Sequence, residues 1–100
     1  MSSSNISSVT KTADAAAISG RTRVVGIYFT NTGSASSFTL KNGSTSGGTA
    51  LVTITTPADA GSQNIRVPDM GILFDSGVFI DVAGADVTSV TLFFEGGAAA

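Results

Sequence analysis

The triplet Asp75-Ser76-Gly77 is the part of this sequence whose residue types point most directly to catalysis. It lies between the apolar runs Ile72-Leu73-Phe74 and Val78-Phe79-Ile80. An Asp-Ser/Thr-Gly triplet in that setting is typical of the catalytic carboxylate of aspartic proteases. In the retroviral-type enzymes, chains of about this size dimerise so that two such aspartates share one proton. The triplet therefore defines one hypothesis, a dimeric aspartic protease that uses Asp75.

The position of the triplet argues against that hypothesis. In retroviral-type proteases the triplet lies early in the chain, and a second apolar-apolar-Gly element follows it to support the aspartates. Here 23 residues follow Gly77, which leaves no room for the flaps and the helix of such an enzyme. A tight turn between two strands is the alternative, because Asp and Ser side chains can hydrogen-bond nearby backbone and Gly can adopt a positive φ. We favour the turn, and we expect Gly77 to tolerate substitution less well than Asp75.

The other candidate groups do not form a recognisable catalytic or metal site. The chain has no Cys and no His, so it lacks thiolate and imidazole ligands and the commonest general base. A Ser-His-Asp triad is excluded on the same ground. Asp69, Asp75 and Asp81 recur at six-residue intervals, but no Asp-x-Asp-x-Asp-Gly calcium loop is present. We therefore expect a protein that is not an enzyme and that needs no metal and no cofactor.

The charge and hydropathy of the chain exclude two classes of partner. Charged residues make up 12% of the chain, and the formal net charge is −2. Arg21 and Arg23 form the one local basic cluster, whereas binding to a phosphate backbone needs many Lys and Arg side chains. No apolar run approaches the ~20 residues that cross a bilayer, and the N-terminal MSSSNISS lacks the basic and apolar parts of a signal peptide. We expect synthesis in a cytoplasm, with neither nucleic acid nor a membrane as a partner.

The elements that position these residues are predicted to be short strands. After residue 20, apolar residues alternate with polar or small ones, which is the period of a half-buried strand. The segments with this pattern are 21–30, 37–41, 50–55, 63–67, 71–74, 78–82 and 87–95. Strands at this spacing, without a helical period between them, predict an all-β fold: a single-domain β-sandwich or jelly-roll-like structure of about eight short antiparallel strands.

Turn signals set the boundaries of the predicted domain. Asn42-Gly43 favours a tight turn, since both residues tolerate positive φ. The glycines that we expect the turns to require are Gly43, Gly71 and Gly77. We assign residues 21–95 to the β-sandwich, residues 1–20 to an N-terminal arm or edge strand that is partly flexible, and residues 96–100 to a flexible tail.

Several large apolar residues fall out of phase with the predicted core. They are Val24, Tyr28, Leu51, Leu73, Phe79 and Phe93. A set that includes three aromatic residues favours a subunit interface or a second buried face. An error in the assigned register of one or two strands is the other interpretation. The low content of charged residues also favours assembly, because buried contacts between subunits compensate for weak charge repulsion between monomers. We therefore expect a homo-oligomer.

The strands and turns between residues 22 and 82 follow a distinctive order. A strand ends in Asn31-Thr32-Gly33, an Asn-Gly turn leads to a strand that begins Gly-Thr, a proline loop follows, and the segment 71–80 fits the frame G-[IV]-x-F-x-x-G-[VL]-x-[VI]. This order resembles that of small β-rich structural proteins of tailed, particularly marine, bacteriophages. The resemblance implies a capsid decoration or cement subunit that binds the major capsid protein or another virion subunit on the capsid exterior. It also implies a trimer, which suits local threefold positions on an icosahedral shell.

A binding module is the alternative to a decoration protein. Exposed Tyr28, Phe79 or Phe93 could form a stacking platform for a sugar or receptor, as part of a phage head or tail fibre. We favour the interface interpretation, because aromatic residues anchor interfaces and no cluster of convergent polar residues is visible in the sequence.

Overall fold

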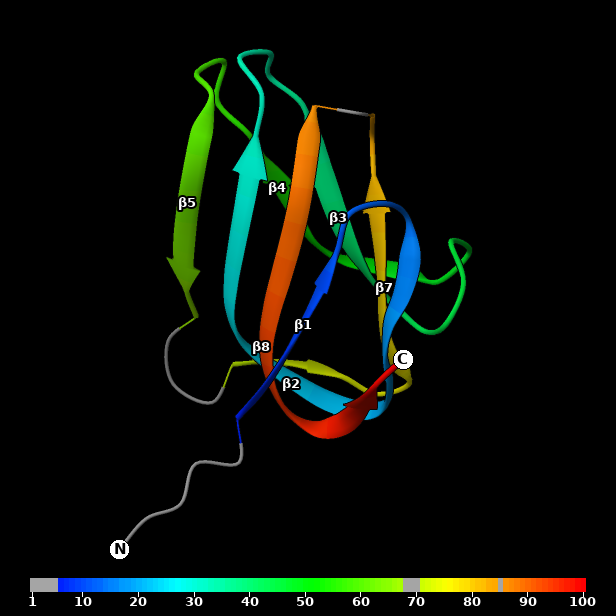
Figure 1. The fold of residues 1–100 in the computed structure, drawn as a ribbon. Helices are drawn as coiled ribbons and strands as arrows, with labels where there is room; N and C mark the ends of the chain where they lie inside the picture. The colour runs from blue at the N-terminus through cyan, green and yellow to red at the C-terminus, as the bar shows by residue number, and fades with distance from the viewer. Residues whose placement is uncertain (1–5, 68–70, 85) are drawn as a thin grey trace, which may run out of the picture.

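The computed structural model describes residues 6–67, 71–84 and 86–100, and it confirms the all-β prediction (Figure 1). These residues form antiparallel strands and contain no helix, so they also contain no helix that could cross a membrane. The strands are β1 (Ser7–Lys11), β2 (Ala15–Asn31), β3 (Ser37–Asn42), β4 (Thr49–Thr55), β5 (Gly61–Arg66), β6 (Ile72–Phe74), β7 (Gly77–Val82) and β8 (Val87–Ala99).

The 17-residue strand β2 organises the sheet. Along one side β2 pairs with β8 over nearly its whole length, and β8 pairs in turn with β1. Along its other side β2 pairs successively with β7, β6 and β5. The sheet therefore divides into two layers, which Figure 1 shows one behind the other. The first layer contains β1, β8, β5 and the second half of β2, and the second layer contains β7, β3 and β4.

The core lies between these layers. Phe29 of the first layer and Phe38 of the second layer meet edge to face, with ring centroids 5.4 Å apart and an interplanar angle of 63°. Such a pair contributes about 0.5–1.5 kcal/mol beyond the apolar area that it buries. The other buried apolar residues are Ala17, Ile18, Val24, Ile27, Leu40, Phe74, Val78, Ile80, Val87, Val90, Leu92 and Phe94. Alternation along β3, β7 and β8 therefore predicted the inward residues of those strands.

The prediction that Val24 lies on an outer face is wrong. Val24 is fully buried, whereas Tyr28 on the same strand is exposed. The reason is a β-bulge: Val24 pairs with Phe94, but Gly26 pairs with the adjacent Phe93, so Val25 is an extra residue on β2. Because side chains alternate with a period of two, one inserted residue reverses which positions point inward. Val24 therefore belongs to the core and cannot be an interface residue.

Both ends of the chain contain more strand than the sequence predicted. Residues 7–11 form β1 at an edge of the sheet, in agreement with the edge-strand alternative, while residues 1–5 of the predicted arm lie outside the described residues. Strand β2 begins at Ala15 and not near residue 21. The last residues do not form a free tail, because β8 continues to Ala99 and the backbone N–H of Ala100 donates to the carbonyl of Ala17 at 2.9 Å. The assigned boundaries at residues 20 and 95 are therefore wrong.

The three glycines singled out for the turns all have positive φ. The φ values are +130° for Gly43, +79° for Gly71 and +112° for Gly77. A Cβ atom on Gly71 would lie 2.5 Å from the carbonyl oxygen of Val24, so the chain also passes too close there for a side chain. At Gly43 the atom nearest to an added Cβ would be 4.0 Å away, so glycine is favoured there only because of the positive φ.

Candidate interaction surfaces

The Asp75 triplet lies on the turn between β6 and β7. Asp75 and Ser76 are exposed, and the backbone N–H of Ser76 donates to Oδ1 of Asn42 at 2.9 Å. The carbonyl of Gly77 accepts a hydrogen bond from the backbone N–H of Gly43 at 3.0 Å. The triplet thus joins its own turn to the end of β3. No group of three or more acidic residues that could hold a metal ion occurs among the residues that the structure describes.

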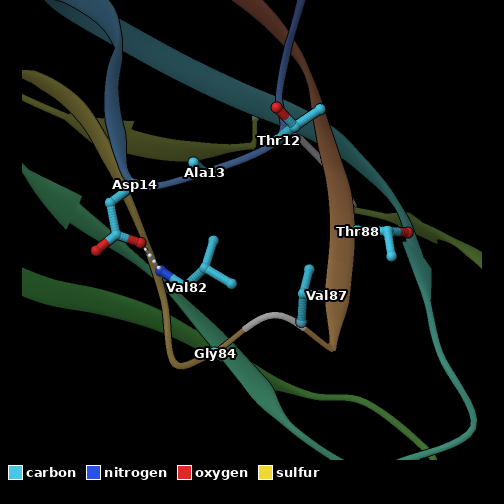
Figure 2. A pocket seen from close by; sticks show the side chains of 7 residues that line it. All are labelled: Thr12, Ala13, Asp14, Val82, Gly84, Val87 and Thr88. Carbon is cyan, nitrogen blue, oxygen red and sulfur yellow. Dashed lines mark hydrogen bonds between the residues drawn. The ribbon is translucent and has the colours of Figure 1, made fainter.

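A hollow of about 610 Å³ lies between the β1–β2 and β7–β8 connections (Figure 2). Its polar groups are the carboxylate of Asp14 and the hydroxyls of Thr12 and Thr88. Oδ1 of Asp14 already accepts a hydrogen bond from the backbone N–H of Val82 at 2.7 Å. The rest of the lining is small or apolar: Ala13, Val82, Gly84 and Val87. These lining residues offer a single carboxylate, so they cannot supply the paired acid and base of a hydrolytic site.

The predicted interface residues do not form one patch. Tyr28, Leu73 and Phe93 lie on the outer face of the first layer, where Tyr28 is 36% exposed. Leu51 and Phe79 belong to the second layer, on the opposite side of the molecule, and Leu51 is 45% exposed. Leu73, Phe79 and Phe93 are half-buried. The sequence therefore identified residues on two surfaces of different chemistry.

The outer face of the second layer combines two apolar residues with two threonines and one ion pair. We call it the Phe79 face, and its residues are Ala16, Thr39, Lys41, Thr53, Phe79 and Asp81. Phe79 lies opposite Ala16 on one side and Lys41 on the other. Lys41 Nζ contacts Asp81 Oδ2 at 2.7 Å and donates to the carbonyl of Ser46 at 2.8 Å. An ion pair exposed to this degree contributes at most about 1 kcal/mol.

Strand β4 borders the Phe79 face and pairs only with β3 among the described strands. Its sequence, TALVTIT, contains no charged residue and no proline. Val52 and Ile54 pack against the core but are only partly buried, and Leu51 bulges from the strand. Edge strands are commonly protected by charged residues. Lys11 in β1 and Arg66 in β5 provide such charges at the other edges, whereas β4 has none.

The outer face of the first layer is rich in hydroxyl groups. We call it the Phe93 face. One row across it consists of Ser8, Phe93, Gly26 and Arg66, and the next consists of Thr10, Thr91, Tyr28 and Asn64. Thr10 Oγ1 and Thr91 Oγ1 are 2.7 Å apart, so one hydroxyl donates to the other. Gly26, Asn64 and Arg66 were not among the predicted interface residues. The signal that could have identified Gly26 is its place within a strand of large residues, where a glycine can mark the close approach of another group.

No family model, no curated protein and no solved structure matches the chain. The two faces and the β4 edge are therefore the features of the molecule that bear on its function.

Proposed function

We propose that the protein is a non-enzymatic structural subunit that assembles through its β4 edge. The resemblance of the sequence to bacteriophage structural proteins suggests which larger assembly this is. We propose that the protein decorates and stabilises the outer surface of the head of a tailed bacteriophage. The observation that carries the assembly proposal is the uncharged and unpaired edge of β4 beside the Phe79 face.

The β4 edge has the length and composition to accept another strand. Seven residues at about 3.3 Å per residue span roughly 23 Å of free backbone donors and acceptors. A strand added there would satisfy these groups and would cover the partly buried Val52 and Ile54. Leu51, which bulges from β4, would add an apolar contact beside the new pair.

The occupant that we propose for the edge is a second copy of this chain. Since β4 carries no charge, it opposes no like charge when it pairs with β1 of a second copy, whose one charged residue is Lys11. A trimer, which the resemblance implies, needs a head-to-tail contact between two different surfaces. The two ends of the sheet path, β1 and β4, supply two different edges for such a ring. The mechanism is then mechanical: rigid sandwiches join into a ring that clamps the underlying shell.

The negative net charge supports a location on the outside of the shell. A chain of formal charge −2 is repelled by packaged DNA, and it lacks the basic clusters that bind a phosphate backbone. The major capsid protein or another virion subunit would then be the partner beneath the ring.

Light scattering of the purified protein, followed by mixing with phage heads assembled without a decoration protein, tests the proposal. We expect an oligomer and saturable binding that raises the temperature at which the heads disrupt. The double variant Leu51→Lys, Thr53→Lys places two charges on the edge and should be a folded monomer. Ser44→Lys, which adds a charge to an exposed loop, is the control and should remain oligomeric. A monomeric wild-type protein over the whole concentration range would contradict assembly through β4.

A further inference from the structure

We propose that the Phe93 face carries a binding site for an acidic saccharide, in the hollow over Gly26 between Phe93 and Arg66. This inference does not depend on the proposed function, because it concerns the face opposite to the Phe79 face and makes no use of the β4 edge.

The hollow lies where Phe93 packs against the bare backbone of Gly26. Phe93, Gly26 and Arg66 lie side by side on three adjacent strands, β8, β2 and β5. A Cβ atom at Gly26 would lie 3.2 Å from Cδ2 of Phe93, so the edge of the ring borders the bare backbone. The resulting depression has a volume of about 300 Å³ and is lined by Ile6, Val25, Gly26, Asn64, Ile65, Arg66 and Phe93. That volume is at the lower end of the range for small-ligand sites.

The groups around the hollow are those that recognise a pyranose ring. Phe93 is half-buried, and it offers an apolar surface for the C–H groups of a sugar. Asn64, which is exposed, supplies an amide donor and acceptor for hydroxyl groups. Tyr28, in the next row, is 36% exposed and adds a second aromatic surface with a hydroxyl at its tip. Sites for small ligands are usually lined by apolar side chains and by a few polar groups that fix the orientation of the ligand.

Arg66 makes the site selective for an acid. Its side chain is exposed, borders the hollow and is paired with no carboxylate among the residues that the structure describes. A guanidinium binds a carboxylate through two parallel hydrogen bonds, a geometry that a lysine cannot reproduce.

The local charge favours the same class of ligand. On the other side of Phe93 from Tyr28, Arg23 of β2 lies opposite Glu95 of β8 in the strand register. These two residues and Arg21 line a second hollow. The residues that line these two hollows include three arginines and one glutamate, a formal charge of +2 on a chain whose net charge is −2. An anion is therefore drawn to this end of the molecule.

A saccharide fits this face better than a nucleic acid does. Much of the rest of the face carries Ser and Thr hydroxyls, namely Ser8, Thr10, Thr30, Ser62, Ser89 and Thr91. A nucleic-acid strand needs a continuous cationic track and successive stacking platforms. Here one arginine and one aromatic ring border the hollow, which suits a single carboxylate-bearing sugar ring.

An NMR titration of the ¹⁵N-labelled protein with tetragalacturonate tests the proposal. We expect saturable shifts at the amides of Gly26, Asn64 and Arg66, with a Kd of about 1 mM or tighter, and at least tenfold weaker binding of the neutral maltotetraose. Arg66→Gln should weaken tetragalacturonate binding about tenfold, as expected for a lost charge-assisted hydrogen bond. Arg21→Gln removes the same charge outside the hollow and should change the affinity less than about threefold.

Four results would overturn the assignment. One is an absence of saturation, and another is equal affinity for the neutral sugar. The third is an equal loss in Arg66→Gln and Arg21→Gln, which would indicate diffuse charge attraction. The fourth is equal or tighter binding of a short single-stranded oligonucleotide through the same amides. Gly26→Val, whose side chain would displace the Phe93 ring beside the hollow, provides a second check: it should abolish binding while the remaining amide spectrum keeps the dispersion of a folded protein.

Discussion

A Cβ atom on Gly77 would lie 2.5 Å from the backbone carbonyl oxygen of Ile18. The two residues belong to β7 and β2, which pair at this point: Ile18 faces Val78, and Ser19 faces Gly77. The φ of Gly77 is +112°, a conformation that L residues with side chains rarely adopt. The turn that contains Asp75 is thus held in place by a position that only glycine can occupy.

Gly77→Ala should therefore be strongly destabilising. Backbone strain and the clash with the Ile18 carbonyl together should lower the free energy of unfolding by about 2–4 kcal/mol. Asp75→Asn, on the exposed part of the same turn, should change it by no more than about 0.5 kcal/mol. Urea denaturation of both variants measures the difference.

Substitutions at two further glycines distinguish the energetic cost of backbone strain from that of a steric clash. Gly43 has a φ of +130° but open space around it, so Gly43→Ala should cost about 1 kcal/mol. Gly84 has neither a positive φ nor a neighbour within 4 Å, and Gly84→Ala should be neutral or slightly stabilising. If Gly77→Ala were no worse than Gly84→Ala, the turn would be wrongly placed. Peptide cleavage that is lost in Asp75→Asn would instead revive the protease hypothesis.

Asn31 should be intolerant of a change to aspartate. Its Nδ2 donates to the backbone carbonyls of Thr32 at 2.8 Å, Asp59 at 2.8 Å and Pro57 at 3.3 Å, so one buried amide fixes the β4–β5 connection to the end of β2. In Asn31→Asp an oxygen replaces that donor and faces three acceptors. We expect a loss of about 3 kcal/mol or more at pH 7.

The pH dependence of that loss identifies its cause. Protonation of the introduced carboxyl restores one donor, so the difference in stability from the wild type should be smaller at pH 4 than at pH 7. Asn64→Asp makes the same chemical change at an exposed position on β5 and serves as the control, with an expected effect of about 0.5 kcal/mol or less. A loss in Asn31→Asp that is equally small would show that the amide does not anchor the connection.

The β-bulge at Val25 predicts opposite outcomes for two positions on β2. Val24→Asp would place a carboxylate in the core and should unfold the protein or cost more than about 4 kcal/mol. Tyr28→Asp affects an exposed side chain and should cost about 1 kcal/mol or less. Circular dichroism and thermal melts distinguish these outcomes. Comparable destabilisation by the two variants would mean that the bulge does not shift the register.

The bulge also shows which parts of the structure the sequence could predict. Strands with one buried face have a period-two pattern, and for this reason β3, β7 and most of β8 were recognised. Residues 15–20 and 96–99 consist mainly of Ala, Gly, Ser and Ile, without such alternation. They are strands because each pairs with the other and β7 pairs with the first, contacts that join distant parts of the chain.

The hollow over Gly26 was unpredictable for the same physical reason. Its lining comes from residues 6, 25–26, 64–66 and 93, which only the strand pairing brings together. The single extra residue at Val25 moved Val24 from the predicted interface to the core, because no local signal distinguishes a bulge from a regular strand in one sequence.

The two outer faces should respond differently to the same substitution. Leu51→Asp places a charge on the β4 edge, which we propose to be buried between subunits, and should convert the oligomer to monomers. Phe93→Asp affects the opposite face and should leave the oligomer intact while it abolishes binding of tetragalacturonate. Light scattering and the NMR titration read these two effects separately. Dissociation by Phe93→Asp, with Leu51→Asp still oligomeric, would assign the subunit interface to the Phe93 face and would leave the hollow over Gly26 covered in the assembly.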